Sequence, residues 1–420
     1  MSARKKLTII GLNYAPEMTG IAPYTTKFCE HMQDHNYEVK VVTGYPHYPS
    51  WSVSPEHQAL PKRQEIGGVG LTRVKHYVPS PPSLLGRLRM EVSFGLRAIR
   101  SDWGNPDAVI CISPSLVTTG LVLLRAKIAR KDLRVGVWVQ DIYTRGMIET
   151  TNAPGAAAKI LSALEARILR TSDSVSVIHS RFKDYVTDVL RVDPQKVHVL
   201  RNWAHVGEAM SIDPVSARNK LGWDWKGTLV LHAGNMGAKQ GLENVVEAAR
   251  IAAERGLNLH FVLLGDGNQR PRLEESGLEI PNLHFIDPVS DELFPVALAA
   301  ADILLVNEKP GVTEMAVPSK LTTYFSSDRP VVAATEQEST TAEEIHNSGG
   351  GVVVAPGKPH DLIEAAIALG ADKVKAANLA TRGKRYRDEV LSASACLAAY
   401  EKWVGEVLAS KESKSSMSTR

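Results

Sequence analysis

The sequence predicts an α/β protein made of two doubly wound domains. Short apolar runs alternate with longer segments whose apolar residues recur at helical spacing, which is typical of parallel sheets covered by helices. This alternation pauses at a polar stretch over 204–227, taken as the interdomain connection, and then begins again. A chain of 420 residues is also too long for one hydrophobic core, so two domains of ordinary size are expected.

The first half opens with a strand, a loop, a helix and a second strand. The apolar run at 7–11 predicts a buried strand, and the loop at 13–20 follows it. Apolar side chains then recur at helical spacing from Ile21 to Met32, which predicts a helix before the next strand at 38–43. Further strands are expected at 107–112, 133–139, 174–178 and 197–200, with an amphipathic helix at 159–170.

The second half repeats this order of elements. A strand at 228–232 precedes a helix at 243–255 and a strand at 258–264. The alternation continues at 270–275, 282–286, 293–300, 303–306, 320–326, 330–334, 341–347, 351–354 and 360–369, and residues 376–403 are mostly helical. We therefore expect domains at 1–205 and 206–385, a C-terminal helix at 386–405 and a disordered Ser/Lys-rich tail at 406–420.

Composition and charge exclude several classes of protein. The chain is 44% hydrophobic and 23% charged, and its net charge of +3 gives no case for nucleic-acid binding. Three widely separated cysteines indicate neither a zinc site nor a disulfide framework and fit a reducing cytosol. The N-terminus lacks the apolar core of a signal peptide, and no run of about 18 apolar residues could span a bilayer. A cytoplasmic protein is expected.

The most informative stretch is the glycine-spaced loop at 234–241. It joins the apolar run at 229–233 to a helix whose apolar face begins at Leu242. Such a unit directs backbone N–H groups and the positive end of the helix dipole at one point, and glycines let a bulky anion approach the backbone. The functional interpretation is a pocket for the diphosphate of a nucleotide. The alternative is the tight turn of any α/β protein.

Other candidate residues lie where parallel strands end, because ligands of doubly wound folds bind at that edge. Gly20 and His47 belong to the loops after the first two strands, and Asp141 follows the strand at 133–139. His47 could instead be an ordinary loop histidine, and Asp141 a turn or helix-cap residue. Residues 79–100 interleave arginines with apolar side chains, which suits an anionic membrane surface or a partly buried helix with solvated arginines.

Several motifs occur in a characteristic order and spacing. They are Asn13-Tyr14-Ala15-Pro16-Glu17 with Gly20, Pro46-His47-Tyr48-Pro49, Gly234-Asn235-Met236-Gly237 with Gln240-Gly241-Leu242, Gly265-Asp266-Gly267, Val317-Pro318-Ser319-Lys320 with Tyr324, and Ser348-Gly349-Gly350-Gly351. On these motifs the chain resembles the GT-B glycosyltransferases, and within them glycosyltransferase family 4, over nearly all of 7–405. It is most similar to the fucosamine- or fucose-transferase-like enzymes of bacterial surface-polysaccharide synthesis.

The resemblance implies a GT-B fold, in which two Rossmann-like domains face each other across a cleft and a C-terminal helix crosses back to the first domain. It implies retaining transfer of a sugar from a UDP- or GDP-sugar donor, with no metal or other cofactor. The implied acceptor is a lipid-linked or polysaccharide-precursor glycan at the inner face of the cell membrane, where the protein is peripherally bound through 79–100.

The resemblance also implies which residues form the site. Backbone N–H groups and cationic side chains would stabilise the charge that grows on the leaving diphosphate. The implied donor-binding residues are Gly20, Gly234, Asn235, Gly237, Gln240, Gly265, Asp266, Pro318, Ser319 and Thr323. The implied catalytic residues are Lys239 and Lys320 at the diphosphate, and His47 and Asp141 at the acceptor.

The sequence departs from the family pattern at a few positions. Asn235 and Gln240 stand where many members carry Arg and Lys, and Met315 and Thr323 stand where many carry two glutamates. Two other functions of this fold therefore stay open: an epimerase or hydrolase acting on the nucleotide sugar itself, and a binding protein without catalysis. An NAD-dependent dehydrogenase fits less well, since no G-x-G-x-x-G with a following acidic residue opens either half.

Overall fold

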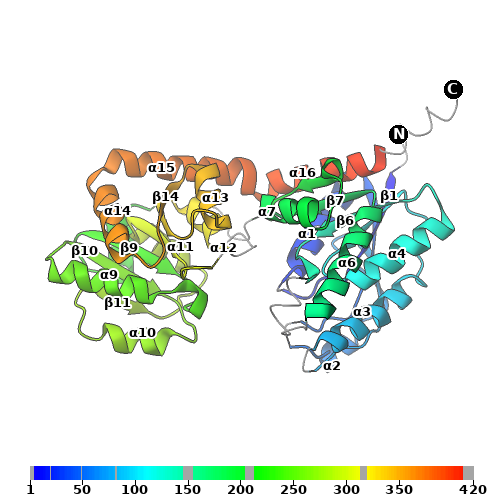
Figure 1. Ribbon diagram of the computed structural model, residues 1–420, viewed down its shortest axis with the longest axis horizontal. Helices are drawn as coiled ribbons and strands as arrows, with labels where there is room; N and C mark the ends of the chain where they lie inside the picture. The colour runs from blue at the N-terminus through cyan, green and yellow to red at the C-terminus, as the bar shows by residue number, and fades with distance from the viewer. Residues whose placement is uncertain are drawn as a thin grey trace. The chain divides into compact units, whose positions relative to one another are not determined.

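Two compact units make up the chain (Figure 1), one formed by residues 1–202 and 396–420 and the other by residues 203–395. The computed structural model describes residues 4–18, 20–48, 50–80, 83–144, 155–203, 212–312 and 319–409. Each unit has its own central sheet covered by helices, which confirms the expected α/β fold class with two Rossmann-like domains.

The first unit contains an eight-stranded sheet in the order β3-β4-β2-β1-β5-β6-β7-β8. Neighbouring strands are parallel, except that β3 runs antiparallel to β4 at one edge. The strands are β1 (Lys5–Ile10), β2 (Tyr37–Thr43), β3 (Arg63–Ile66), β4 (Val69–Arg73), β5 (Ala108–Ile112), β6 (Arg134–Val139), β7 (Ser174–Val177) and β8 (Val197–Val199). β1 pairs with β2 on one side and with β5 on the other, so the direction of winding reverses between β1 and β5. Ligands of such sheets bind beyond the carboxyl ends of the two strands at the reversal.

Helices of the first unit connect these strands. They are α1 (Ala22–Asp34), α2 (Pro55–Gln58), α3 (Leu84–Ala98), α4 (Leu116–Ala129), α6 (Gly155–Thr171) and α7 (Ser180–Asp184), the last continuing as a π-helix over Tyr185–Val189. The Ser83 hydroxyl accepts a hydrogen bond from the Gly86 N–H and caps α3. α3 packs against α4, and α4 against α6, so the three lie side by side (Figure 1).

The second unit contains a six-stranded parallel sheet in the order β11-β10-β9-β12-β13-β14. Its strands are β9 (Thr228–Ala233), β10 (Leu259–Leu264), β11 (Leu283–Ile286), β12 (Ile303–Asn307), β13 (Val331–Ala334) and β14 (Gly351–Val354). Numbered within the unit, this is the strand order of dinucleotide-binding sheets, and its reversal falls between β9 and β12. A ligand of this unit is therefore expected beyond the carboxyl ends of these two strands.

Helices cover both faces of the second sheet. They are α8 (Pro214–Leu221), α9 (Glu243–Glu254), α10 (Arg270–Gly277), α11 (Phe294–Ala300), α12 (Ser319–Tyr324), α13 (Thr340–Ser348), α14 (Pro359–Ala371) and α15 (Lys373–Tyr386). Successive side chains of a strand point to opposite faces, so Val230 and Leu231 of β9 belong to two separate hydrophobic cores, one on each face. The sheet is thus buried on both sides.

The C-terminal helix α16 (Ala393–Ala409) returns to the first unit. From residue 396 onward it belongs to that unit, where the Tyr400 hydroxyl donates to the Leu200 carbonyl at 3.1 Å and Trp403 Nε1 donates to Ser174 Oγ at 2.8 Å. This confirms the expected crossing of the C-terminal helix. Of the helices in the described ranges, none combines the length and apolar character needed to cross a membrane.

Candidate active site

The bend after β9 is held by backbone packing against the loop after β10. Gly234 N–H donates to the Leu264 carbonyl at 2.8 Å, and Met236 N–H donates to the Asp266 carbonyl at 2.8 Å. Gly265 has φ +135°, and a Cβ there would lie 2.1 Å from the Gly234 carbonyl oxygen. Only glycine permits this approach, so Gly265 serves the shape of the bend. Asp266 likewise serves the turn, since its Oδ1 accepts from the Gly267 N–H at 2.7 Å.

The second part of the loop is a short 3-10 helix over Ala238–Gln240 that is braced from within. Gln240 Oε1 accepts from the Gly237 N–H at 3.0 Å, so these two residues bind each other. Asn307, the last residue of β12, donates from Nδ2 to the Gln240 carbonyl at 2.8 Å. The Lys239 carbonyl accepts from the Lys309 N–H at 2.9 Å. The loop after β9 is therefore fastened to the end of β12, at the reversal point of the sheet.

Lys320, near the start of α12, lies against the Gly234 bend. A Cβ on Gly234 would meet Lys320 Cε at 2.9 Å, so the absence of a side chain there leaves room for the lysine. The Tyr324 hydroxyl accepts from the Ala233 N–H at 2.8 Å and thereby anchors α12 to β9. The fold thus brings Gly234 and Lys320, which are far apart in the sequence, together at the carboxyl end of β9.

The Lys320 ammonium is held by a buried histidine. Its Nζ donates to Nε2 of His232 at 2.8 Å, and His232 lies inside β9 with 1% of its surface exposed. Burial, reinforced by the nearby ammonium, keeps the pKa of His232 well below its usual range, so this ring is neutral and accepts the hydrogen bond. Burial also lowers the pKa of Lys320 to about 8, against the attraction of Glu308. Lys320 is therefore a poorly solvated cation.

Glu308, directly after β12, is the buried carboxylate of this site. Its Oε1 accepts from the Thr341 hydroxyl at 2.6 Å, and its Oε2 accepts from the Thr335 hydroxyl. Thr335 directly follows β13, and Thr341 lies in the first turn of α13. The carboxylate thus fixes the ends of two neighbouring strands and supplies negative charge that favours the charged form of Lys320.

The remaining candidates of the second unit are placed as follows. Asn235 packs its amide over Gly237, where a Cβ would lie 2.8 Å from Asn235 Nδ2. Thr323 lies partly buried on α12, and its carbonyl accepts from Ser326 Oγ at 2.6 Å. Ser319 begins α12. Pro318 and Met315 lie outside the described residues.

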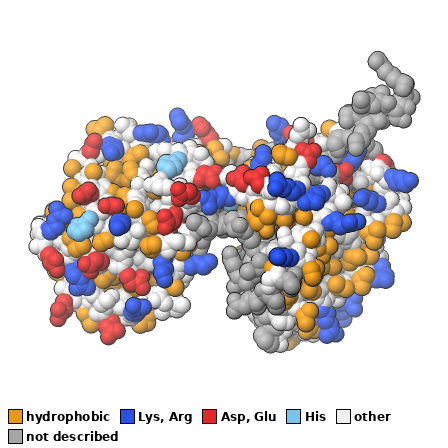
Figure 2. All heavy atoms as spheres, viewed as in Figure 1, with side chains coloured by type: hydrophobic (Ala, Val, Ile, Leu, Met, Phe, Trp, Pro, Cys, Tyr) orange, Lys and Arg blue, Asp and Glu red, His pale blue; other side chains and the backbone are white. Residues whose placement is uncertain are grey.

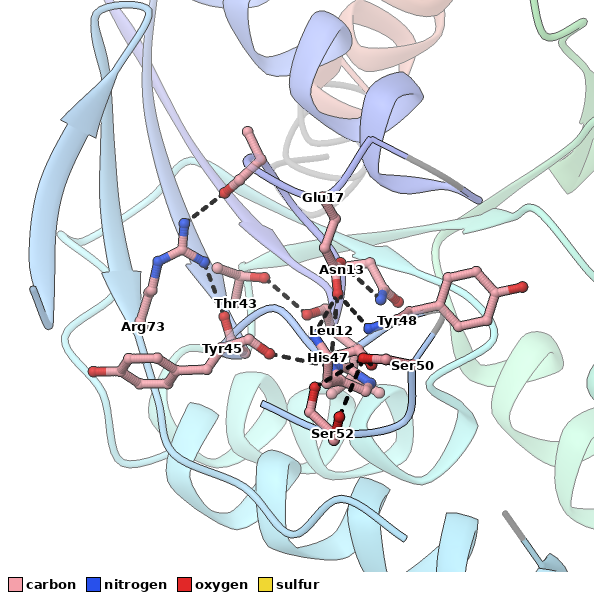
Figure 3. Close-up of polar contacts among 12 residues, drawn as sticks. Leu12, Asn13, Glu17, Thr43, Tyr45, His47, Tyr48, Ser50, Ser52 and Arg73 are labelled. Atoms are coloured by element: carbon pink, nitrogen blue, oxygen red, sulfur yellow. Dashed lines mark hydrogen bonds and ion pairs between the residues drawn. The ribbon is translucent and has the colours of Figure 1, made fainter. Parts of the chain in front are cut away.

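In the first unit, Glu17 joins the two loops that follow β1 and β2 (Figure 3). Its Oε1 accepts from the backbone N–H groups of His47 at 2.8 Å and Tyr48 at 3.0 Å, while its Oε2 accepts from Asn13 Nδ2 at 2.9 Å. Arg73, at the end of β4 and 1% exposed, donates to the carbonyls of Gly44 and Ala15. Both loops are therefore fixed by buried charged side chains.

His47 itself is buried, with 4% of its surface exposed. Its Nδ1 lies 3.1 Å from the Tyr45 carbonyl oxygen, which accepts its hydrogen bond. The ring packs edge-on against His76, with the centroids 4.8 Å apart. Gly20 has φ +63° and lies against the Tyr48 ring.

Asp141 follows β6 at the same edge of the first sheet. It is exposed, and its carbonyl accepts from the Ser113 hydroxyl at 3.0 Å, which ties it to the end of β5. Asp141 and His47 thus both lie beyond the carboxyl ends of the first unit's strands.

Four charged or histidine side chains that shape the two sites were not selected from the sequence: Glu17, Arg73, His232 and Glu308. Two of them could have been noticed in the sequence. His232 is a polar residue inside the apolar run at 229–233, and Glu17 ends the motif at 13–17.

Comparison with protein families agrees with this geometry. The Glycosyl transferase 4-like domain matches residues 19–203, and Glycosyl transferases group 1 matches residues 227–372. The chain is 31% identical over 332 residues to the WcaI protein of Escherichia coli strain K12, assigned as a glycosyl transferase of colanic acid biosynthesis, with 76% of this chain and 80% of the relative covered. It is 25% identical over 228 residues to WbjE of Pseudomonas aeruginosa, assigned as a glycosyltransferase, with 53% and 55% covered.

The same fold occurs in solved structures of low sequence identity. Sucrose-phosphate synthase from Thermosynechococcus elongatus superposes with a TM-score of 0.67 at 15% identity, covering 97% of this chain and 100% of that one. Anabaena HepE, solved in complex with UDP, superposes with a TM-score of 0.64 at 14% identity over 97% and 100%. WaaG, a glycosyltransferase involved in lipopolysaccharide biosynthesis, gives 0.59 at 16% identity over 95% and 100%.

Two Rossmann-like units, with a C-terminal helix that returns to the first unit, define the GT-B class of fold. Within that class, the chain belongs to glycosyltransferase family 4.

Proposed function

We propose that this protein is a retaining, metal-independent glycosyltransferase that moves a sugar from a UDP- or GDP-sugar to a lipid-linked or polysaccharide-precursor acceptor in cell-surface glycan synthesis. The observation that carries the proposal is the poorly solvated Lys320 ammonium, lying against the Gly234 bend at the reversal point of the second sheet. The similarity to WcaI favours a surface polysaccharide. Within the family, the fucosamine- or fucose-transferase-like subgroup is the finer assignment.

The chemistry of the transfer accounts for a cation at this point. The bond between the anomeric carbon and the diphosphate oxygen breaks, and the acceptor oxygen forms a bond to the same carbon on the same face. The acceptor proton passes to the departing diphosphate, on whose oxygens negative charge has grown. Lys320 stabilises that charge more strongly than a solvated lysine would, since the surrounding dielectric is low. Although burial lowers the pKa of Lys320 to about 8, this value still favours the protonated ammonium at pH 7.

The other candidate residues take supporting roles in this proposal. Lys239 and the backbone of the bend complete the diphosphate pocket, with Asn235, Gly237 and Gln240 shaping it. Asp266 and Thr323 border the nucleoside, together with Gly265, Pro318 and Ser319. Gly20 lets the loop after β1 approach the donor, and His47 and Asp141 act on the acceptor.

A surface of the first unit fits the membrane that a lipid-linked acceptor requires. We call the exposed side of α3, α4 and α6 the basic apolar face. Their carboxylates, Glu91 and Glu165, are both buried, so they add no negative charge to the surface. Its exposed apolar residues are Leu85, Val92, Leu96, Leu124, Ile128, Ile160 and Leu164, and its exposed cations are Arg89, Arg97, Lys127, Lys159, Arg167 and Arg170.

Figure 2 shows hydrophobic and basic side chains interspersed over these helices. Cations attract anionic lipid headgroups, and exposed apolar side chains enter the boundary between headgroups and acyl chains. This mixture supports peripheral binding to the inner face of the cell membrane. It extends the expected segment at 79–100 to two neighbouring helices.

The test uses the full chain, a panel of UDP- and GDP-sugars, and an undecaprenyl-diphosphate-linked sugar as acceptor. We expect release of the nucleoside diphosphate only with one donor and acceptor together, and a product with retained anomeric configuration. Release or rearrangement of the donor without acceptor would assign a hydrolase or epimerase instead. Absence of both reaction and UDP or GDP binding by calorimetry would indicate a protein without catalysis.

A further inference from the structure

A cluster of two histidines and one glutamate lies where α1 and α16 pack together in the first unit. His31 lies in the last turn of α1, His35 is the C-cap residue that directly follows this helix, and Glu401 lies on α16. One ligand atom from each lies within 4.8 Å of the other two. Among the described residues this is the one group of three His, Cys, Asp or Glu side chains with such geometry.

The hydrogen bonds of His35 prepare its ring for a cation. His35 Nδ1 lies 2.8 Å from the His31 carbonyl oxygen, to which it donates, so Nε2 is the ring nitrogen that would face a metal. Histidines that bind metals are commonly fixed in this way, with one ring nitrogen donating to a backbone carbonyl and the other directed at the metal. The ring stacks on that of His31 with the centroids 3.9 Å apart, so both imidazoles have defined orientations.

His31 and Glu401 supply the other two ligand atoms. His31 Nε2 lies 3.3 Å from Glu401 Oε2, and that nitrogen is screened from solvent. Two imidazole nitrogens and one carboxylate oxygen are the ligands of many zinc sites, which leave a fourth position for water.

The surrounding packing gives the cluster a rigid frame. One turn before His31, Phe28 packs against Tyr400 with the ring centroids 5.8 Å apart, and both side chains are fully buried. The two helices are therefore held together next to the three ligands. His35 and the start of α1 at Ala22 are about 20 Å apart along the helix, so the cluster lies far from the loops that begin α1.

We propose that His31, His35 and Glu401 form a site for a divalent transition-metal cation of the zinc type, which fastens α16 to α1. The site takes no part in sugar transfer, for which no metal is proposed. Its cation links a residue near the end of the chain to the first helix and stabilises the first unit. Mg²⁺ does not replace it, since that ion prefers oxygen ligands.

Calorimetric titration of the full, untagged chain with Zn²⁺ tests the site. We expect one Zn²⁺ per chain in the wild type, and affinity reduced in both His35→Gln and Glu401→Gln by at least the roughly 10- to 100-fold that loss of a hydrogen-bond partner of a metal ligand costs. His346→Gln, an exposed helical histidine of the second unit, is the matched control and keeps wild-type affinity.

Two further readouts make the outcome decisive. Zn²⁺ should raise the unfolding temperature of the wild type and of His346→Gln but not of Glu401→Gln, and Mg²⁺ should raise none of them. Bound Co²⁺ should give the visible absorption of a tetrahedral site. Absence of binding, or equal affinity in the wild type and Glu401→Gln, would overturn the proposal, because the carboxylate distinguishes this site from a simple pair of surface histidines. His35 and Glu401 are not buried, so both variants should fold.

Discussion

At the scale of single residues, the second unit depends on a charge that is held out of water. Lys320 donates to a neutral histidine on one side and is attracted by a buried glutamate on the other. Neither partner is close to it in the sequence. The arrangement keeps a poorly solvated cation at the strand ends.

Replacing this cation should reduce turnover more than stability. We expect Lys320→Met to lower kcat by about 10²- to 10³-fold, the typical effect of removing one group that stabilises transition-state charge. Its melting temperature should stay near that of the wild type, since methionine fills the space and removes a buried charge. Steady-state kinetics and thermal unfolding give the two values, and Lys375→Ala, an exposed lysine on α15, is the control. Unchanged kcat would remove Lys320 from the reaction.

The pH dependence should report the same group. Because the pKa of Lys320 is lowered to about 8, the ammonium is lost as the pH rises through that value. We therefore expect kcat/KM to fall above pH 8 in the wild type. Lys320→Arg, whose side chain stays charged, should lack this fall even if its activity is lower. A wild-type profile that stays flat to pH 9.5 would contradict the assignment.

At the scale of elements, Glu17 is the residue on which the loops of the first unit depend. Glu17→Ala removes the acceptor of the buried His47 N–H, of the partly buried Tyr48 N–H and of the Asn13 amide. Each unsatisfied donor costs about 1–3 kcal/mol, so we expect the free energy of unfolding to drop by roughly 2–4 kcal/mol. Chemical denaturation measures this drop. Glu38→Ala, which removes an exposed ion pair, should change it by less than about 0.5 kcal/mol.

The basic apolar face makes a second prediction at this scale. Arg89→Glu with Lys127→Glu should release the protein from vesicles that contain anionic lipid, because both cations are exposed and on adjacent helices. Co-sedimentation measures the bound fraction. Lys375→Glu with Arg385→Glu makes the same charge change on the second unit, and this control should stay bound. Equal binding by both double variants would remove the face from membrane contact.

The elements also show what sequence patterns can and cannot predict. The strands β1, β2, β9 and β10 were readable because buried parallel strands form short continuous apolar runs. The edge pair β3 and β4 was not predicted, since neither RQEI of β3 nor VGLTR of β4 forms a continuous apolar run. The helix α4 was missed because its apolar residues extend around the helix without a clear face.

The candidate sites were only partly predictable for a different reason. The glycine loop and Lys320 carry local motifs, so their types and positions could be selected. Glu308 and His232 act through contacts 33 and 88 residues away, and nothing in their local sequence encodes those partners. Glu17 likewise reaches across 30 residues to His47.

At the scale of the whole molecule, each unit contains a partly buried histidine that is neutral near pH 7. Burial lowers the pKa of His76 to about 3 in the first unit and that of His284 to about 4 in the second. The unfolded chain binds protons at these rings near pH 6.5, whereas the folded chain does not. Stability present above pH 6.5 is therefore lost as the pH falls below it, by less than about 1.4 kcal/mol per pH unit for each ring, because solvent screens these partly exposed groups.

Thermal unfolding between pH 7.5 and 5 should show this loss in both units. The melting temperature should fall with pH, and His284→Gln should make the fall in the second unit's transition shallower. His360→Gln, which changes an exposed histidine, should leave the slope as in the wild type. A melting temperature that is independent of pH over this range would contradict the burial argument.

The path of α16 has a consequence for how the protein is made. Tyr400 and Trp403 belong to the core of the first unit, yet they follow the whole second unit in the chain. During synthesis from the N-terminus, residues up to 202 must wait for almost two hundred more to emerge before their last helix can dock. The second unit, which is continuous in sequence, meets no such delay, so the part of the protein made first is the part completed last.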